Sequence, residues 1–201
     1  MIMFMTLDGV AEFPVYSEAE PSEEELDEDP MWTNRMSKID TILLGRTSYE
    51  KWAGYWPAQR ENPGASPFQK AFAAFADEAK KVVFSKTLRS ASWKNTAIAR
   101  GELTREVNRL KSLPGKDMAL GGGPRLAQSF LEHDLVDEML LEVFPSILGR
   151  GRPLFNVRQD PDNPKDFVPV GAPGRHDFAL LEARKVAGED TVFLHYKRKP
   201  D

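Results

Sequence analysis

Residues 41–50 read TILLGRTSYE, an apolar, β-rich run that glycine stops and that a stretch with helical character follows. Similar short runs occupy residues 81–84, 96–99 and 118–120, each bounded by glycine or polar residues. Uninterrupted apolar runs of this length are typical of strands buried on both faces of a parallel sheet. The pattern therefore predicts an α/β protein built around a largely parallel sheet.

Stretches with helical character separate these runs. In residues 68–80, Phe68, Phe72 and Phe75 recur at the i, i+4, i+7 spacing of a core-facing helix. We expect helices over residues 30–38, 47–53, 68–80, 104–111 and 124–131.

The two ends of the chain complete the predicted sheet. Residues 1–7 and 136–144 predict further strands, and residues 177–186 and 191–196 flank a glycine-containing turn that predicts an antiparallel hairpin. Together these elements predict a three-layer α/β/α fold with a mixed sheet, mostly parallel and closed by the C-terminal hairpin. We expect a single domain over residues 1–201.

Two long segments carry no strand or helix pattern. Residues 10–29 and the Pro- and Gly-rich residues 156–175 are expected to be loops of the length that lids, binding loops or insertions have. Residues 18–29, EAEPSEEELDED, hold eight acidic and no basic side chains, so the net charge of −4 becomes +4 without them. We interpret this acidic run as a solvated loop rather than a partner site.

Composition excludes several classes of function. The chain has no cysteine, which rules out disulfides, thiolate metal sites and a cysteine nucleophile. His133, His176 and His195 are not at metal-ligand spacing, so we expect no metal. The basic charge is too weak for nucleic-acid binding, and no apolar run approaches the roughly 18 residues of a membrane span. Because the first residues, MIMFMTLDGV, do not resemble a signal peptide, we expect a soluble, cytoplasmic protein.

The first candidate binding motif is Gly45-Arg46-Thr47, where the strand of residues 41–44 runs into a helix. A helix N-terminus offers unpaired N–H groups and a partial positive charge, glycine allows close approach, and the guanidinium fork of Arg46 suits a phosphate. The alternative is a capped helix that carries a surface arginine.

The second motif runs from Gly121 through Gly122 and Gly123 into Pro124 and Arg125, again from strand to helix. Three glycines leave no Cβ to obstruct a pyrophosphate, and their N–H groups can form an anion-binding nest. Proline suits the first position of the following helix. A tight turn explains two of the glycines but does not easily explain three.

The third motif, Ser85-Lys86-Thr87, follows the strand of residues 81–84. A lysine among small hydroxyls suits the ribose 2′-phosphate that distinguishes NADP from NAD, and an ordinary polar turn is the alternative. Because the carboxyl ends of parallel strands share one edge of a sheet, we expect the three motifs to meet there as one dinucleotide site.

In this order and at these separations, residues 44–50, 84–88 and 121–123 resemble dihydrofolate reductase. They resemble more closely the reductase domain at the C-terminus of bifunctional riboflavin-biosynthesis deaminase-reductases. Three further segments resemble that branch, namely residues 6–9 (TLDG), 135–138 (LVDE) and 145–149 (PSILG). The resemblance spans nearly the whole chain.

The resemblance implies NADPH as the cofactor. It places Gly45, Arg46 and Thr47 at the cofactor phosphates, Ser85 and Lys86 near the adenosine 2′-phosphate, and the glycine run with the following helix start at the pyrophosphate. It also implies a homodimer that forms through the C-terminal strands. No deaminase domain is expected within these residues, so a role in riboflavin synthesis is not implied.

Asp8 is the candidate catalytic residue. It follows the first strand and could bind or protonate a polar heterocycle, although an Asp8-Gly9 turn is the alternative. Asp29 lies where dihydrofolate reductases carry a carboxylate, but the proline after it favours a helix N-cap. Four aromatic residues either line the pocket or belong to the core: Trp32, Trp52, Tyr55 and Trp56.

Two functions fit these features. The first is an NADPH-dependent reductase that passes hydride to a small substrate, such as a pterin-like, pyrimidine-like or other carbonyl or imine compound. The second is a non-catalytic nucleotide-binding or regulatory homodimer that keeps the cofactor pocket. Turnover of the bound cofactor distinguishes them.

Overall fold

The computed structural model describes residues 1–11, 35–155, 157–159, 167–169, 177–186, 188 and 190–200. Its residues form two compact units. The terminal unit contains residues 1–11 and the described residues from Gly123 onward, and the central unit contains residues 35–122. The single domain expected from the sequence stays a prediction.

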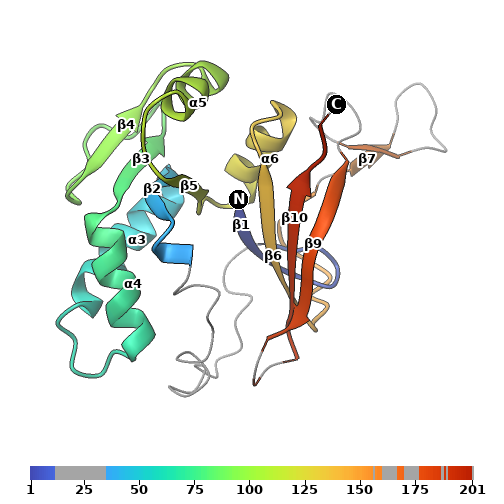
Figure 1. The fold of residues 1–201 in the computed structure, drawn as a ribbon, viewed down its shortest axis with the longest axis horizontal. Coiled ribbons are helices and arrows are strands. Elements are labelled where there is room, and N and C mark those ends of the chain that lie inside the picture. Colours follow the sequence, from blue (N-terminus) through green and yellow to red (C-terminus); the bar gives the residue numbers. More distant parts are fainter. Residues whose placement is uncertain are drawn as a thin grey trace. The chain divides into compact units, whose positions relative to one another are not determined.

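The central unit contains a four-stranded, fully parallel sheet, as the short apolar runs predict. Its strands, in spatial order, are β4 (Thr96–Ala99), β3 (Lys80–Phe84), β2 (Ile39–Gly45) and β5 (Asp117–Leu120) (Figure 1). The register pairs Gly45 with Phe84 and Leu43 with Leu120. The carboxyl ends of the strands therefore lie along one edge of the sheet.

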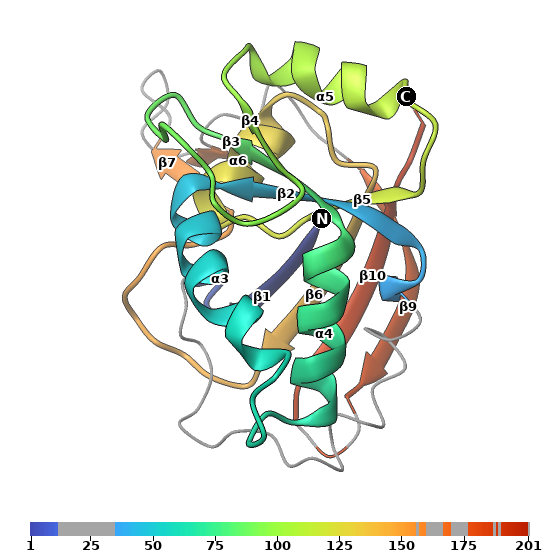
Figure 2. The ribbon, with the colours of Figure 1, turned by 90° about the vertical axis from the view of Figure 1, so that its left-hand side faces the viewer.

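Helices cover both faces of this sheet. They are α3 (Arg46–Gln59), α4 (Pro67–Glu78) and α5 (Leu103–Lys111). Figures 1 and 2 show α3 and α4 on one face and α5 on the other. Because both faces are covered, residues 41–44 of β2 are all buried. The central unit thus has the predicted three layers.

Helix α3 is longer than the predicted range of 47–53, although it contains Gly54 and Pro57. Both residues disfavour a helix interior, so local propensity predicts an earlier end. The rings of Trp52 and Trp56 pack on Phe72 of α4, with centroids 5.5 and 4.4 Å from it. We attribute the extra turns to this aromatic packing, which no local pattern reveals.

The terminal unit contains a mixed sheet. Its strands, in spatial order, are β1 (Ile2–Thr6), β6 (Glu138–Phe144), β10 (Val192–Arg198) and β9 (Phe178–Lys185), and its helix is α6 (Pro124–Glu132). Strands β1 and β6 are parallel, whereas β10 is antiparallel to both β6 and β9. The predicted C-terminal hairpin is confirmed.

The predicted loop over residues 156–175 is wrong in part. Strands β7 (Val157–Gln159) and β8 (Phe167–Pro169) form an antiparallel pair inside it. Three-residue strands are too short for a period-two pattern to stand out in a Pro- and Gly-rich context. The acidic run, Asp29, Trp32 and His176 lie outside the described residues, and only the end of the helix expected over 30–38 is described, with residues 35–36 helical.

Candidate cofactor site

The carboxyl edge of the central sheet carries the first and third predicted motifs and the start of the second. Arg46 directly follows β2, Ser85 directly follows β3, and Gly121 directly follows β5. The backbone N–H of Gly121 donates to the carbonyl of Leu43 over 3.1 Å, which extends the pairing of β5 with β2. The structure therefore brings the first motif, the third motif and the start of the second to the same edge of the central sheet.

The guanidinium of Arg46 joins the first motif to the third. Its Nη1 donates to Oγ1 of Thr87 over 3.1 Å, and its Nε pairs with Oε1 of Glu50 one helical turn away, at 2.8 Å. About half of the Arg46 side chain is exposed (49%). Because Thr87 accepts this hydrogen bond, its own hydroxyl proton is free to point at another acceptor. The pair forms a donor surface suited to an anion.

The turn after β3 is shaped by Ser85. Its Oγ accepts hydrogen bonds from the backbone N–H groups of Thr87 and Leu88, at 3.2 and 2.9 Å. Local bonds of this kind hold a tight polar turn. The Lys86 side chain is exposed within the turn. The motif is thus a polar turn, as the alternative interpretation holds. This turn can also bind a ligand, because it presents Lys86 and Thr87 to solvent.

Helices α3 and α6 differ from α4 and α5 at their first turns. Gly45 and Gly123 are the N-caps of α3 and α6, and neither helix has a side-chain cap or an acidic residue in its first turn. In contrast, Ser66 closes a capping box on α4, and the Glu102 carboxylate accepts two backbone N–H bonds on α5. No side chain therefore competes with an external anion for the N–H groups that begin α3. In α6, Pro124 has no N–H and the N–H of Leu126 donates to the carbonyl of Gly123, which leaves that of Arg125.

The glycine run has a structural role at its first position. The N–H of Gly121 already bonds within the sheet, and a Cβ there would lie 3.1 Å from Cη2 of Trp52. Close packing therefore explains the first glycine. Gly122 is buried, and Gly123 is the N-cap of α6. Pro124, the first residue of the helix, is buried, and Arg125 is exposed. The interpretation of the run as a phosphate-binding loop therefore depends on the amides after Gly121. The sequence did not predict the contact of Gly121 with Trp52.

Asp8 lies in the turn after β1. Its Oδ1 accepts from the Thr6 hydroxyl at 2.5 Å, and its Oδ2 accepts from the backbone N–H of Gly149 at 2.8 Å. These bonds, with that from Thr6 the strongest cause, lower the pKa of the Asp8 carboxyl below its ordinary value of 3.8. Gly9 follows with φ +78°, which favours glycine. Asp8 is thus an ionised turn residue, suited to accepting hydrogen bonds and not to donating a proton.

The described aromatic candidates divide between core and surface. Trp52 and Trp56 are half-buried against the core of α3 and α4. Tyr55 is exposed, and its hydroxyl accepts a hydrogen bond from Nε2 of Gln69 at 2.9 Å. The core interpretation therefore accounts for the two tryptophans.

Residues 1–166 match the protein family described as the RibD C-terminal domain. The chain belongs to the RibD C-terminal domain family. The match covers the strand, turn and helix junctions described above, so the resemblance seen in the sequence is confirmed. Family membership supports a reductase-type function.

The chain is related to two proteins of Bacillus subtilis (strain 168). The chain is 40% identical to the uncharacterized protein YyaP over 136 residues, which cover 67% of this chain and 69% of YyaP. It is 27% identical to the uncharacterized protein YwjB over 118 residues, which cover 59% of each chain. Neither name states an activity.

Solved structures share the RibD C-terminal domain fold. A putative riboflavin biosynthesis protein from Shewanella superposes with a TM-score of 0.67 at 18% identity, over 99% of this chain and 97% of the other. RibD of Acinetobacter baumannii gives 0.56 at 17% identity, over 98% of this chain but 56% of RibD. Dihydrofolate reductase from Enterococcus faecalis gives 0.52 at 10% identity, over 99% and 95%. At these identities the likeness shows the fold.

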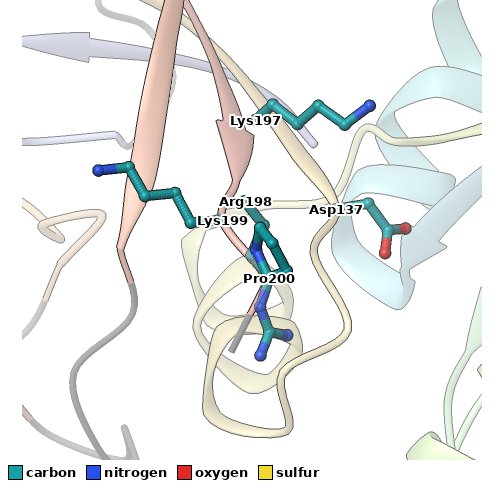
Figure 3. A pocket seen from close by; sticks show the side chains of 5 residues that line it. All are labelled: Asp137, Lys197, Arg198, Lys199 and Pro200. Carbon is teal, nitrogen blue, oxygen red and sulfur yellow. The ribbon is translucent and has the colours of Figure 1, made fainter.

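One hollow in this family member falls outside the predicted motifs. It lies at the end of β10, has a volume of about 390 Å³, and is lined by Asp137, Lys197, Arg198, Lys199 and Pro200. Figure 3 shows Lys197 and Lys199 pointing to opposite sides. Residues two apart in a regular strand share a face, but Lys199 lies beyond Arg198, the last residue of β10. The Arg198 guanidinium is paired with Asp134. The positive charges therefore do not converge on one point.

Other site types are not found in the described part of the chain. Those residues contain no group of three or more His, Asp or Glu side chains that could hold a metal ion. They also contain no helix of the length and apolarity that crossing a bilayer requires.

Proposed function

We propose that this protein is an NADPH-dependent reductase that transfers hydride to a small, pterin- or pyrimidine-like substrate. The observation that carries the proposal is the Arg46–Thr87 hydrogen bond, which joins two candidate anion-binding motifs at the carboxyl edge of a parallel sheet. Ligands of open α/β sheets bind at that edge. The reductase-type function of the family supports the same conclusion.

The residues at this edge fit a dinucleotide with an additional phosphate. In the proposal, Arg46, Ser85, Lys86 and Thr87 hold the 2′-phosphate. Arg46 and Lys86 supply positive charge, and the two hydroxyls supply hydrogen bonds. A half-exposed guanidinium with a fixed plane can bind phosphate without a large ordering cost.

The pyrophosphate is assigned to uncapped backbone amides. The N–H groups at the start of α3, after Gly45, have no side-chain acceptor, and the first turn of α3 has no acidic residue that would repel a phosphate. The backbone of Gly121 and Gly122, which follows β5 in the same unit, is assigned to the pyrophosphate with them. Thr47 adds a hydroxyl in the first turn of α3. Bound NADPH supplies the hydride, and the protein's part is to orient the nicotinamide and the substrate.

Asp8 is assigned to the substrate. Its carboxylate is ionised at neutral pH, because hydrogen bonds from Thr6 and Gly149 lower the pKa of Asp8. An ionised carboxylate can accept hydrogen bonds from the N–H groups of a polar heterocycle. It cannot supply the proton of the reduction, so that proton comes from another source. Asp8 therefore binds and orients in this proposal.

Calorimetric titration with NADPH and NADH tests the binding half of the proposal. Binding of NADPH tighter than that of NADH supports it, and binding of neither nucleotide overturns it. The absorbance of NADPH is then followed in the presence of pterins, pyrimidines and small carbonyl and imine compounds. Oxidation of NADPH with one of these classes supports the reductase. Tight binding without turnover on any compound would identify the non-catalytic nucleotide-binding protein instead.

A further inference from the structure

Trp52, in the central unit, links the helix that carries the first binding motif to the first glycine of the second. It belongs to α3, whose first residue is Arg46, and its indole reaches the end of β5. A Cβ built on Gly121 would lie 3.1 Å from Cη2 and 3.5 Å from Cζ2 of this indole. Real Cβ contacts are rarely so short, so the indole and the Gly121 backbone are in close contact.

The indole is held in place on its other sides. Its ring meets Phe72 of α4 edge-on, with centroids 5.5 Å apart and planes at 75°, and meets Trp56 in the same way at 6.3 Å. Phe72 is 4% exposed and is part of the core. A side chain packed in this way has little room to shift, because protein interiors are close-packed. A larger side chain at position 121 would therefore displace the backbone and not the indole.

Gly121 is thus constrained from two directions. Its N–H is bonded to the carbonyl of Leu43 in the sheet, and its α-carbon is backed by Trp52. Together these contacts determine where the chain leaves β5 and where the following amide, that of Gly122, begins. Helix α3 carries both Arg46 at its first position and Trp52 nearly two turns later, so one helix contacts both motifs.

We propose that Trp52 is a positioning residue for the cofactor: it holds the Gly121–Gly122 backbone in the path that pyrophosphate binding requires. This inference rests on the proposed function, because it concerns the same nucleotide. Trp52 acts through the backbone of the glycine run and not through the 2′-phosphate corner. Its loss therefore weakens NADPH and NADH alike, whereas a purely structural role lowers stability without changing the affinity of the folded protein.

The first experiment compares Trp52→Leu with Trp56→Leu as a matched control. Both indoles are half-buried on α3 and contact Phe72, but only Trp52 is among the near neighbours of Gly121. Calorimetry is expected to show that Trp52→Leu weakens both nucleotides by about tenfold, and Trp56→Leu by less than about twofold. Equal effects of the two variants, or none from Trp52→Leu, overturn the proposal.

The second experiment is a rescue. Gly121→Ala alone is expected to weaken both nucleotides by about tenfold, because the new methyl group pushes the backbone away from Trp52. In the double variant Gly121→Ala with Trp52→Leu, the leucine leaves room for the alanine methyl group. Both nucleotides are then expected to bind more tightly than they bind the Gly121→Ala single variant. Affinity losses that simply add contradict the proposed contact. The same comparison is made with a second double variant, Gly121→Ala with Trp52→Phe. Unfolding midpoints establish that each variant is folded.

Failure of the proposed function and failure of the positioning role give different results. If the unaltered protein binds neither nucleotide, the proposed function is wrong and this inference falls with it. If the unaltered protein binds NADPH and the Trp52 and Gly121 variants behave as independent changes, the positioning role alone is wrong.

Discussion

The Nη1 of Arg46 lies 3.1 Å from Oγ1 of Thr87, a residue 41 positions away in the sequence. This hydrogen bond spans the ends of two neighbouring parallel strands, β2 and β3. It holds the guanidinium beside the turn that contains Lys86, where two positive charges can act on one phosphate. This contact is the reason that our proposal places Arg46 at the 2′-phosphate and not at the pyrophosphate.

Replacing Arg46 with alanine should weaken NADPH by about ten- to hundredfold, or 1.5–3 kcal/mol, because one charge-assisted contact is lost. The affinity for NADH should change little, since NADH has no 2′-phosphate. Arg105→Ala, which removes an exposed arginine from α5, is the control and should leave both affinities unchanged. Equal weakening of both nucleotides would place Arg46 at the pyrophosphate instead, and unchanged affinities would remove it from the site.

The protonation state of Asp8 is open to a kinetic test. Its pKa is lowered by the Thr6 hydroxyl and the Gly149 amide, so the carboxylate persists at and above the ordinary Asp value of 3.8. The stabilising bonds of the carboxylate are then lost only as the pH falls through the lowered pKa. We expect kcat/KM to show no inflection from Asp8 near neutral pH, and Asp8→Asn to raise KM. An inflection near neutral pH that disappears in Asp8→Asn would show that Asp8 donates a proton.

Lys81 offers a prediction on stability. It is fully buried, and its Nζ donates to the carbonyls of Ala76, Asp77 and Ala79 at the end of α4 and lies 4.4 Å from the centre of the Trp93 ring. Burial lowers the pKa of Lys81 from 10.5 to about 8, although the nearby Asp77 opposes the shift. Between about pH 8 and pH 10.5, the folded protein has therefore released the proton of Lys81, whereas the unfolded chain still binds it.

The free energy of unfolding should therefore rise with pH between about 8 and 10.5, by at most about 1.4 kcal/mol per pH unit from this group. Lys81→Met should lack this rise, and chemical denaturation at a series of pH values measures the difference. The other lysines titrate in both proteins, so the comparison isolates Lys81. Parallel stability curves for the two proteins would mean that the buried amine keeps its ordinary pKa.

We propose that the C-terminal hairpin forms the interface of the homodimer that the sequence resemblance implies. Strand β9 stands last in the order of its sheet, and its Leu180 and Leu181 are each 53% exposed. Edge strands with exposed apolar side chains tend to pair with another chain. Light scattering after size-exclusion chromatography should give a dimer that Leu180→Lys dissociates. Ile147→Lys, at an exposed apolar position outside the strands, should leave the dimer intact; a monomeric unaltered protein would refute the proposal.

Local pattern was sufficient for much of the fold. The strands around residues 41–44, 81–84, 96–99 and 118–120 lie where their apolar runs predict. Burial on both faces of a parallel strand requires such runs, so the signal is contained in a few consecutive residues. The same holds for the glycine-to-helix junctions at Gly45 and Gly123, since a strand end, a glycine and a helix start are neighbours in the chain.

Other features depend on contacts between distant residues and left no local signal. The full length of α3 needs the packing of Trp52 and Trp56 on a second helix, which outweighs Gly54 and Pro57. Three consecutive glycines look alike in the sequence, yet the sheet takes the N–H of Gly121 and Trp52 takes the space beside it. Strand order decides which motifs become neighbours, because hydrogen bonds between strands join residues that the chain holds far apart.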